Sequence, residues 1–228
     1  MYLDILTTDT NNKIQDNKEK ILNLYKAFGQ FLTTKYRDWI HEIAFGFLVA
    51  EYVLKLKDVS IDDNIDEVLL FARRLLEVFI ISKYIVNTNK FQTMRDYCVH
   101  DRHEYLKGCM ARGIADEKLI PELAGLDNFL LEYQKQEKEL LAQYGLGKRM
   151  PPMKKMAEEI DCLDEYNYFY KFTSKLLHFC PFTLSGDANF DGEIHKVVFL
   201  YRAAKYIEKI RYELENIYQR IPKILRSL

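Results

Sequence analysis

The sequence predicts an all-α protein, a single-domain bundle of about six or seven helices with a long C-terminal helix. Apolar residues recur at intervals of three and four along most of the chain, which is the period of an α-helix, and no segment alternates as a strand does. Only 9 glycines and 5 prolines occur among 228 residues, a composition that favours long helices over many turns. We therefore expect one helical domain over residues 1–228.

The first half of the chain is expected to be helical almost throughout. Apolar periodicity predicts a helix at about Lys13–Tyr36, after a Thr-Asp-Thr-Asn-Asn run typical of a helix start, and another at about Arg37–Leu56. A third helix, at about Ile65–Val86, is apolar around most of its circumference and should lie in the middle of the core. The helix that follows, at about Asn89–Arg112, is much more polar.

The second half combines helices with longer loops. The expected elements are, in order, an interrupted helix at Ala115–Tyr144, a loop at Gly145–Pro152, a short helix at Met153–Ile160, an aromatic-rich helix at Tyr166–Pro181 and an irregular segment at Cys180–Gly192. The last helix runs from about Glu193 to the C-terminus, with a kink at Pro222. Its apolar residues form a heptad-like seam that could pack in the bundle or between protomers. The seam comprises Val197, Tyr201, Ala204, Ile207, Ile210, Leu214, Ile217, Ile221 and Ile224.

Composition and motifs exclude several classes of function. The formal net charge of −1 gives the chain no general attraction to nucleic acid, so RNA would need a local patch. The most apolar runs contain charged residues, which excludes a membrane span, and the N-terminus does not resemble a targeting signal. Scattered cysteines without a CxxC pair indicate reduced thiols in a cytoplasmic protein. No nucleotide-binding, dinucleotide-binding, zinc-protease or serine-hydrolase motif occurs, so no cofactor is predicted.

Residues Asp187–Gly192 match the first half of a calcium-binding loop, in which alternate Asp and Asn side chains supply oxygen ligands. The position at which a bidentate Glu should complete the cage is Val198. A turn whose Asp side chains cap the last helix explains the same residues. Both interpretations stay open, and no metal ligand is assigned.

Charged residues interrupt the otherwise apolar third helix. Glu77 is four positions after Arg73 and three after Arg74, spacings that put each arginine beside it on a helix. A charge inside such a helix costs several kcal/mol unless it is paired, so we expect an arginine of this helix to pair with Glu77. Whether the pair is structural or belongs to a functional site stays open at this stage.

The aromatic-rich helix carries a polar stripe that ends in a histidine. Its members are Asn167, Lys171, Ser174 and His178. Spacings of four, three and four residues place them on one face of an α-helix. Lys175 lies three positions before His178, which places a cation beside an imidazole that titrates near neutral pH. Cleavage of a phosphodiester requires both kinds of group. A core histidine that hydrogen-bonds Ser174 or Glu77 is the alternative interpretation.

A second arrangement of arginine and histidine lies in the polar fourth helix. Arg95 and His100 are separated by four residues, and such pairs resemble those of HEPN-type ribonucleases, which act on the 2′-hydroxyl and the scissile phosphate. A solvated polar face that also includes Asp101, Arg102 and His103 explains the same residues. We treat Arg95 and His100 as an alternative site.

Several segments together resemble the family called domain of unknown function 5677, found in bacteria, archaea and phages, over about Ile65–Pro181. They are ARRLLEVFIISKYI at Ala72–Ile85, MPPMKKMAEEID at Met150–Asp161 and YNYFYKFTSKLLHFCP at Tyr166–Pro181. The resemblance implies a compact helical protein in which one polar cluster forms. Its members would be Arg74, Glu77, Tyr170, Ser174 and His178. A broader likeness to HEPN-type and abortive-infection proteins suggests RNA cleavage or antiviral defence by analogy.

These observations lead to two main hypotheses. In the first, the protein is a non-catalytic interaction or ligand-sensing module of bacterial or phage defence, organised around this polar cluster. In the second, it is a HEPN-like, metal-independent ribonuclease or toxin, with His178 as base and Lys171, Lys175 or Arg74 as the cation for the phosphate. A metal-binding bundle that uses Glu77 and His178 is a third hypothesis, which no ExxH pair supports. The sequence does not identify a partner: RNA and a second copy through the C-terminal helix are both candidates, and no membrane is expected.

Overall fold

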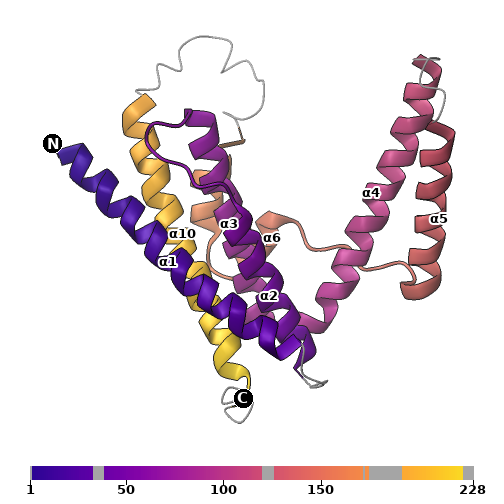
Figure 1. Ribbon diagram of the computed structural model, residues 1–228, viewed down its shortest axis with the longest axis horizontal. Coiled ribbons are helices and arrows are strands. Elements are labelled where there is room, and N and C mark those ends of the chain that lie inside the picture. The colour runs from indigo at the N-terminus through magenta and orange to yellow at the C-terminus, as the bar shows by residue number, and fades with distance from the viewer. Residues whose placement is uncertain (1, 33–38, 120–125, 172, 175–191, 223–228) are drawn as a thin grey trace. The chain divides into compact units, whose positions relative to one another are not determined.

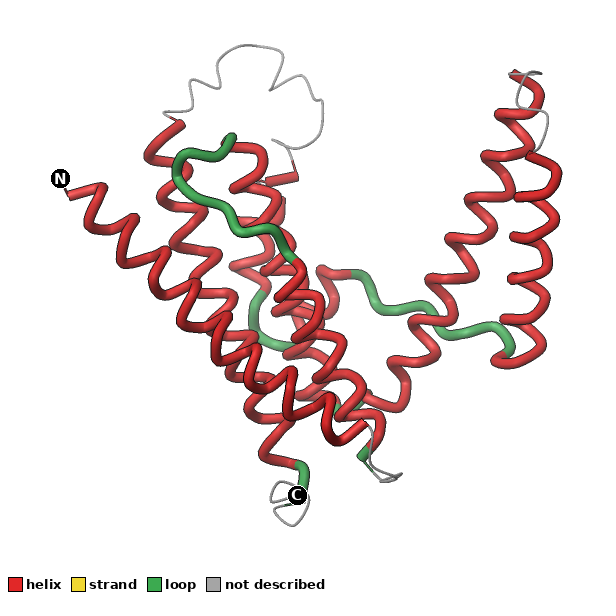
Figure 2. The backbone as a smooth tube through the Cα atoms, in the orientation of Figure 1, coloured by secondary structure: helices red, strands yellow, loops and turns green. Residues whose placement is uncertain are grey.

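The computed structural model describes residues 2–32, 39–119, 126–171, 173–174 and 192–222 (Figure 1). Every regular element in these ranges is a helix, and no strand occurs in them (Figure 2). The all-α prediction is confirmed. None of the helices described combines the length and the apolar character that a bilayer span needs.

The observed helices follow the order that the sequence predicts. The first four are α1 at Tyr2–Leu32, α2 at Ile40–Lys55, α3 at Ile65–Thr88 and α4 at Phe91–Leu119. They are followed by α5 at Leu126–Tyr144, α6 at Met153–Glu159, α7 at Leu163–Glu165, the π-helix η1 at Tyr166–Tyr170 and α10 at Gly192–Arg220. The predicted kink at Pro222 is wrong, because α10 ends at Arg220, before the residue that lacks an N–H for the helical ladder.

α1 begins far earlier than the predicted start at Lys13. The Thr-Asp-Thr-Asn-Asn run, which by itself is typical of a helix start, lies inside the helix. Thr10 and Asn17 are buried there, and Asp9 forms an ion pair with Lys13 at 2.8 Å, one turn away. Tertiary packing outweighs the capping preference of these residues, since most helix stability in proteins comes from a buried face.

The first compact unit comprises Met1–Asn89 and Pro152–Leu228. Within it α10 packs against α1, α2 and α3, and α1 packs against α2 (Figure 1). The predicted seam of α10 is buried over most of its length, at Ala204, Ile207, Ile210, Leu214, Ile217 and Ile221. These residues therefore pack inside the bundle and are not free to contact another protomer.

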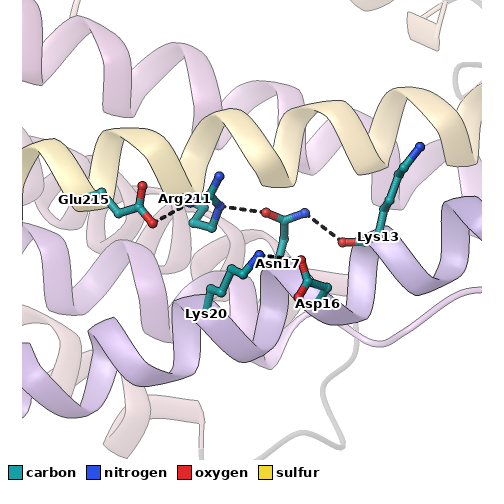
Figure 3. A network of polar contacts seen from close by, with 6 residues as sticks. All are labelled: Lys13, Asp16, Asn17, Lys20, Arg211 and Glu215. Atoms are coloured by element: carbon teal, nitrogen blue, oxygen red, sulfur yellow. Dashed lines mark hydrogen bonds and ion pairs between the residues drawn. The ribbon is translucent and has the colours of Figure 1, made fainter.

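A polar network joins α1 to α10 (Figure 3). Arg211 Nε donates to Asn17 Oδ1 at 2.8 Å, and the Asn17 amide donates to the Lys13 carbonyl at 2.8 Å. Arg211 also pairs with Glu215, one helical turn further along α10. Because Asn17 is buried, its side chain needs these partners, and they hold the two helices in one register.

The second compact unit comprises Lys90–Pro151 and contains α4, α5 and the predicted loop after them. α4 and α5 pack as an antiparallel pair, and the Nε2 atom of buried His103 lies 2.9 Å from Glu137 Oε1. Gly147 lies directly on α4, since a Cβ at this position would be 2.1 Å from the Asp96 carbonyl oxygen. The prediction that residues 1–228 form a single domain stays a prediction.

Candidate functional site

A π-helical turn replaces the start of the predicted aromatic α-helix. α7 runs directly into η1, in which the Lys171 amide bonds the Tyr166 carbonyl five residues earlier. The hydroxyls of Thr173 and Ser174 both donate to the Tyr170 carbonyl, at 3.0 and 2.8 Å, and so compete for an acceptor of the regular ladder. π-Helical turns are rare in proteins, and those that occur are often found at functional sites. The surroundings of η1 are therefore the first candidate for a functional site.

The described members of the predicted polar stripe differ in exposure. The side-chain oxygen of Asn167 is buried and has no hydrogen-bond partner among the residues described. Lys171, in contrast, is exposed. Whether the polar residues of this stripe share one face stays a prediction, since His178 lies outside the described residues.

Tyr166, Tyr170 and Arg73 form a stacked ladder between η1 and α3. The two rings are 4.7 Å apart and inclined by 17°, and the Arg73 guanidinium carbon lies 4.4 Å from the Tyr170 ring centroid. Arg73 Nε also donates to Glu77 Oε1 at 3.1 Å. The predicted pairing of Glu77 with an arginine of its own helix is confirmed, and the arginine is Arg73. Arg74 is exposed.

A second contact between an arginine and a tyrosine joins η1 to α10. The Arg202 guanidinium carbon lies 5.3 Å from the ring centroid of Tyr168, which is 61% exposed. Glu165 holds Arg202 in place, because it accepts hydrogen bonds from Arg202 at 2.5 Å and from the buried Tyr206 hydroxyl. Burial opposes ionisation of Glu165, but these hydrogen bonds outweigh it and lower the pKa of the carboxyl. Glu165 is therefore an anion that positions Arg202 beside Tyr168.

These residues form two aromatic–cationic patches around η1, one with α3 and one with α10, which we together call the aromatic–cationic surface. Tyr166, Tyr170 and Arg73 form the patch with α3, and Tyr168 and Arg202 form the patch with α10. Residues two apart project to opposite sides of a helical turn, so the two patches lie on different sides of η1. Arg73 and Arg202 are each neutralised by a glutamate. Arg74 and Lys171 are exposed, and neither forms an ion pair with a residue that the structure describes. Phe169 anchors the turn, since its buried ring lies 5.7 Å from each of two aromatic rings of α10. The surface thus offers flat aromatic faces, and two exposed cations follow its members in the chain without an ion-pair partner in the described ranges.

Part of the predicted cluster lies outside the described residues. Lys175 and His178 fall in the segment 175–191, as does most of the loop considered for calcium. Ser174 is half-buried, and its hydroxyl bonds the backbone. The meeting of His178 with Arg74 and Glu77 therefore stays a prediction.

A comparison with known protein families finds a match over the segment that runs from the loop before α3 to the start of α10. Residues 62–195 match the family described as Family of unknown function (DUF5677). The chain belongs to this family. Neither a curated protein nor a solved structure matches it. The DUF5677 match confirms the resemblance found in the sequence and includes η1 and Arg73, while Arg202 and Tyr206 lie beyond it. Because the description of DUF5677 states no activity, function has to be argued from the site itself.

Within the DUF5677 region, Arg95 and His100 have separate neighbours. The Arg95 guanidinium carbon lies 5.5 Å from the ring centroid of Tyr144. His100 Nδ1 is buried without a hydrogen bond, 3.6 Å from the nearest oxygen of Asp101. Residues five apart project about 140° from each other on an α-helix, so α4 directs these two side chains to different sides. Joint action of Arg95 and His100 stays a prediction.

Sequence reasoning missed the glutamate that organises the surface. Glu165 contacts Arg202 and Tyr206, which are 37 and 41 residues away, and no local pattern links them. The one local signal was the alternation of tyrosines at 166, 168 and 170. In the part of the chain that the structure describes, no three His, Cys, Asp or Glu side chains group as a metal ion would need.

Proposed function

We propose that the protein is a non-catalytic binding module for single-stranded RNA, and that the aromatic–cationic surface around η1 is its contact. The observation that carries the proposal is Tyr168, an exposed ring held against the Arg202 guanidinium. RNA bases present flat faces that stack on aromatic side chains and on arginine, largely independently of base identity. A ring that is both exposed and fixed in position loses little conformational freedom when a base stacks on it.

The charges at the border of this surface suit a phosphate backbone. Arg74 follows Arg73 in the chain and Lys171 follows Tyr170, so the backbone of each cation is one residue from a member of the stacked ladder. Both are exposed and without a carboxylate partner in the described ranges. Because the net charge of the whole chain is only −1, the attraction is local, and binding should fall steeply as salt rises.

The HEPN-like ribonuclease is the second candidate. Lys171 supports it, as an exposed cation without an ion-pair partner among the described residues that could contact a phosphate. His178 would be the base, with Lys175 beside it. A role in antiviral defence rests on analogy for either candidate.

Fluorescence anisotropy with a labelled single-stranded RNA of mixed sequence tests the proposal. Tyr168→Ala should weaken binding by about 5- to 150-fold, because stacking of a base on an aromatic ring contributes about 1–3 kcal/mol. Replacing Arg74 and Lys171 together by Glu should also weaken binding. That double variant should in addition flatten the dependence of log Kd on log salt, since fewer counterions are released.

Two matched variants control for nonspecific effects. Tyr105→Ala removes a tyrosine of α4 that is 64% exposed, and Lys148→Glu reverses an exposed charge in the loop after α5. Both should bind RNA as the wild type does. Equal affinity of the wild type and Tyr168→Ala would contradict the proposal. RNA that is shortened by the wild type and left intact by His178→Ala would favour the ribonuclease instead.

A further inference from the structure

α10 carries an exposed seam on the side away from the core. Its members follow one another at spacings of four, three, four, three and four residues, as the a and d positions of heptads do. They are Ile194, Val198, Tyr201, Lys205, Glu208 and Tyr212, and every one of them is exposed. On an α-helix they project within about 80° of one another, opposite buried Ala203 and Ile210. We call these residues the outer seam.

The outer seam is more apolar than a solvated helix face. Ile194, Val198, Tyr201 and Tyr212 are 49, 39, 45 and 51% exposed. The face of a helix that points away from the core of a globular protein ordinarily carries polar and charged residues. Here the charges are confined to the middle of the seam, with apolar residues on both sides of them. This pattern is typical of a surface that packs against another helix.

We propose that the outer seam binds a second copy of this chain, with the two α10 helices antiparallel about a twofold axis between Lys205 and Glu208. This arrangement puts Lys205 opposite the partner's Glu208, and Glu208 opposite the partner's Lys205. In the next layer Tyr201 faces the partner's Tyr212. The seam is therefore self-complementary, as a twofold interface has to be.

Charge selects the antiparallel orientation. In a parallel pair Lys205 would face the partner's Lys205 and Glu208 would face the partner's Glu208, and like charges face to face repel. The antiparallel pair turns both contacts into attractions. Inside one chain the Lys205 ammonium lies 4.8 Å from the Tyr201 ring centroid, and neither Lys205 nor Glu208 has an ion-pair partner among the described side chains. Lys13 of α1, which is itself paired with Asp9, is a cation that acts on Glu208 from beyond ion-pair distance.

A hollow beside the seam provides space for the partner's aromatic ring. It has a volume of about 490 Å³ and is lined by Thr10, Val197, Val198, Tyr201, Arg202 and Lys205. In the antiparallel pair the partner's Tyr212 lies opposite Tyr201, at the wall of this hollow. A tyrosine inserted into a pocket is a common anchor of protein interfaces. The inference rests on α10 and its neighbour α1 alone and does not depend on RNA binding.

Light scattering after size-exclusion chromatography, over a series of concentrations, tests the proposal on the full chain. The wild type should change from monomer to dimer as concentration rises. Lys205→Glu and Glu208→Lys should each raise the dissociation constant on the order of tenfold or more, since each replaces two attractions by two repulsions. The double variant K205E/E208K should return to near the wild-type value, because opposite charges face each other again.

Folding of the variants is checked by circular dichroism. Both side chains are exposed, so the single variants should melt as the wild type does. Lys138→Glu, which reverses an exposed charge on α5, should dimerise like the wild type. A wild type that is monomeric at every concentration overturns the proposal, as does a double variant that dimerises no better than the single ones.

Disulfide trapping tests the orientation. In the antiparallel pair Tyr201 and the partner's Tyr201 would be about 16 Å apart along the helix, too far for a disulfide. A mixture of Tyr201→Cys and Tyr212→Cys chains should therefore cross-link under mild oxidation. Tyr201→Cys alone should link no more than the wild type, which contains the same native cysteines. Strong linking of Tyr201→Cys alone would indicate a parallel pair and overturn the arrangement.

Discussion

Glu165 accepts hydrogen bonds from Arg202 and Tyr206, two residues of α10 that lie beyond the matched family region. Burial and the hydrogen bond to Glu165 both raise the pKa of Tyr206, so its hydroxyl stays protonated and remains a donor. The negative charge of Glu165 is thus balanced by one cation and one neutral donor. It orients Arg202 and, through Arg202, the exposed ring of Tyr168.

Glu165→Gln should lower the stability of the fold at neutral pH by about 1–2 kcal/mol, because it removes the charge from two hydrogen bonds. The folded-state pKa of Glu165 lies below its unfolded value of about 4.3, so its stabilising effect is fully present above that pH. The effect is lost as the pH falls through the folded-state pKa. Urea denaturation of the wild type and of Glu165→Gln, repeated over a series of acid pH values, measures the difference in their free energy of unfolding.

The matched control is Glu158→Gln, which removes the charge from a surface pair with Lys154 at 3.6 Å. Such a pair contributes at most about 0.5 kcal/mol, so this variant should unfold almost as the wild type does at every pH. A stability difference between the wild type and Glu165→Gln that does not change with pH would contradict the assigned charge.

Residue spacing predicted the partner of Glu77 only in part. Both Arg73 and Arg74 are close enough to Glu77 on a helix, and the cluster predicted from the sequence includes Arg74. The structure pairs Glu77 with Arg73, because this arginine points toward the Tyr170 ring while Arg74 projects into solvent. Which of two adjacent residues faces a neighbouring element depends on the packing of that element, and spacing within one helix carries no information about it.

At the scale of whole helices, the crossing of α1 and α2 depends on a glycine. A Cβ at Gly46 would lie 2.6 Å from the ring of Phe28, which is fully buried. The absent side chain lets α2 approach α1 until the ring covers the backbone of Gly46. The ring cannot move aside freely because it is enclosed by the core.

Gly46→Ala should therefore destabilise the protein by about 1–3 kcal/mol, despite the higher helix propensity of alanine. Gly29→Ala is a matched control in α1, where the new Cβ would lie 3.5 Å from Phe47, an ordinary contact. That variant should be neutral or stabilised by up to about 1 kcal/mol. Thermal unfolding followed by circular dichroism measures both, and equal melting temperatures of the two variants would refute the role of Gly46.

Helix η1 shows where periodicity misleads at this scale. The spacing of Asn167, Lys171 and Ser174 predicts one polar face because it assumes a regular α-helix. The structure has a π-helical turn at Tyr166–Tyr170, closed by a hydrogen bond from the Lys171 amide to the Tyr166 carbonyl, and residue spacing does not predict this departure. In α3, where no such departure occurs, the predicted apolar helix was right almost to its ends.

For the molecule as a whole, the chain divides into two compact units, and Gly147 tests whether they are stable independently. Gly147→Ala would place a Cβ 2.1 Å from the Asp96 carbonyl oxygen and 2.6 Å from the His100 amide nitrogen, both backbone atoms that cannot move alone. We expect hydrogen exchange to speed up in α4 and α5, with little change in α1, α3 and α10.

Gly108→Ala is the control for this experiment. It lies in α4 on the exposed side, and no atom is within 4 Å of the added Cβ. Hydrogen exchange in the Gly108→Ala variant should stay at the wild-type level or slow slightly, because alanine favours a helix. If Gly147→Ala speeds exchange equally in α1 and α10, the two units unfold together and the chain is one cooperative domain.

Local patterns in the chain were enough to establish the all-α class, the buried character of α3, the loop at Gly145–Pro152 and the family. Helix periodicity and family motifs are properties of neighbouring residues, so they can be read without a fold. The tertiary structure decided which seam of α10 is buried, which arginine pairs with Glu77, and that Glu165 meets Arg202 and Tyr206. These outcomes depend on the free energy of packing helices that are far apart in sequence, and that free energy outweighs local preference wherever the two compete.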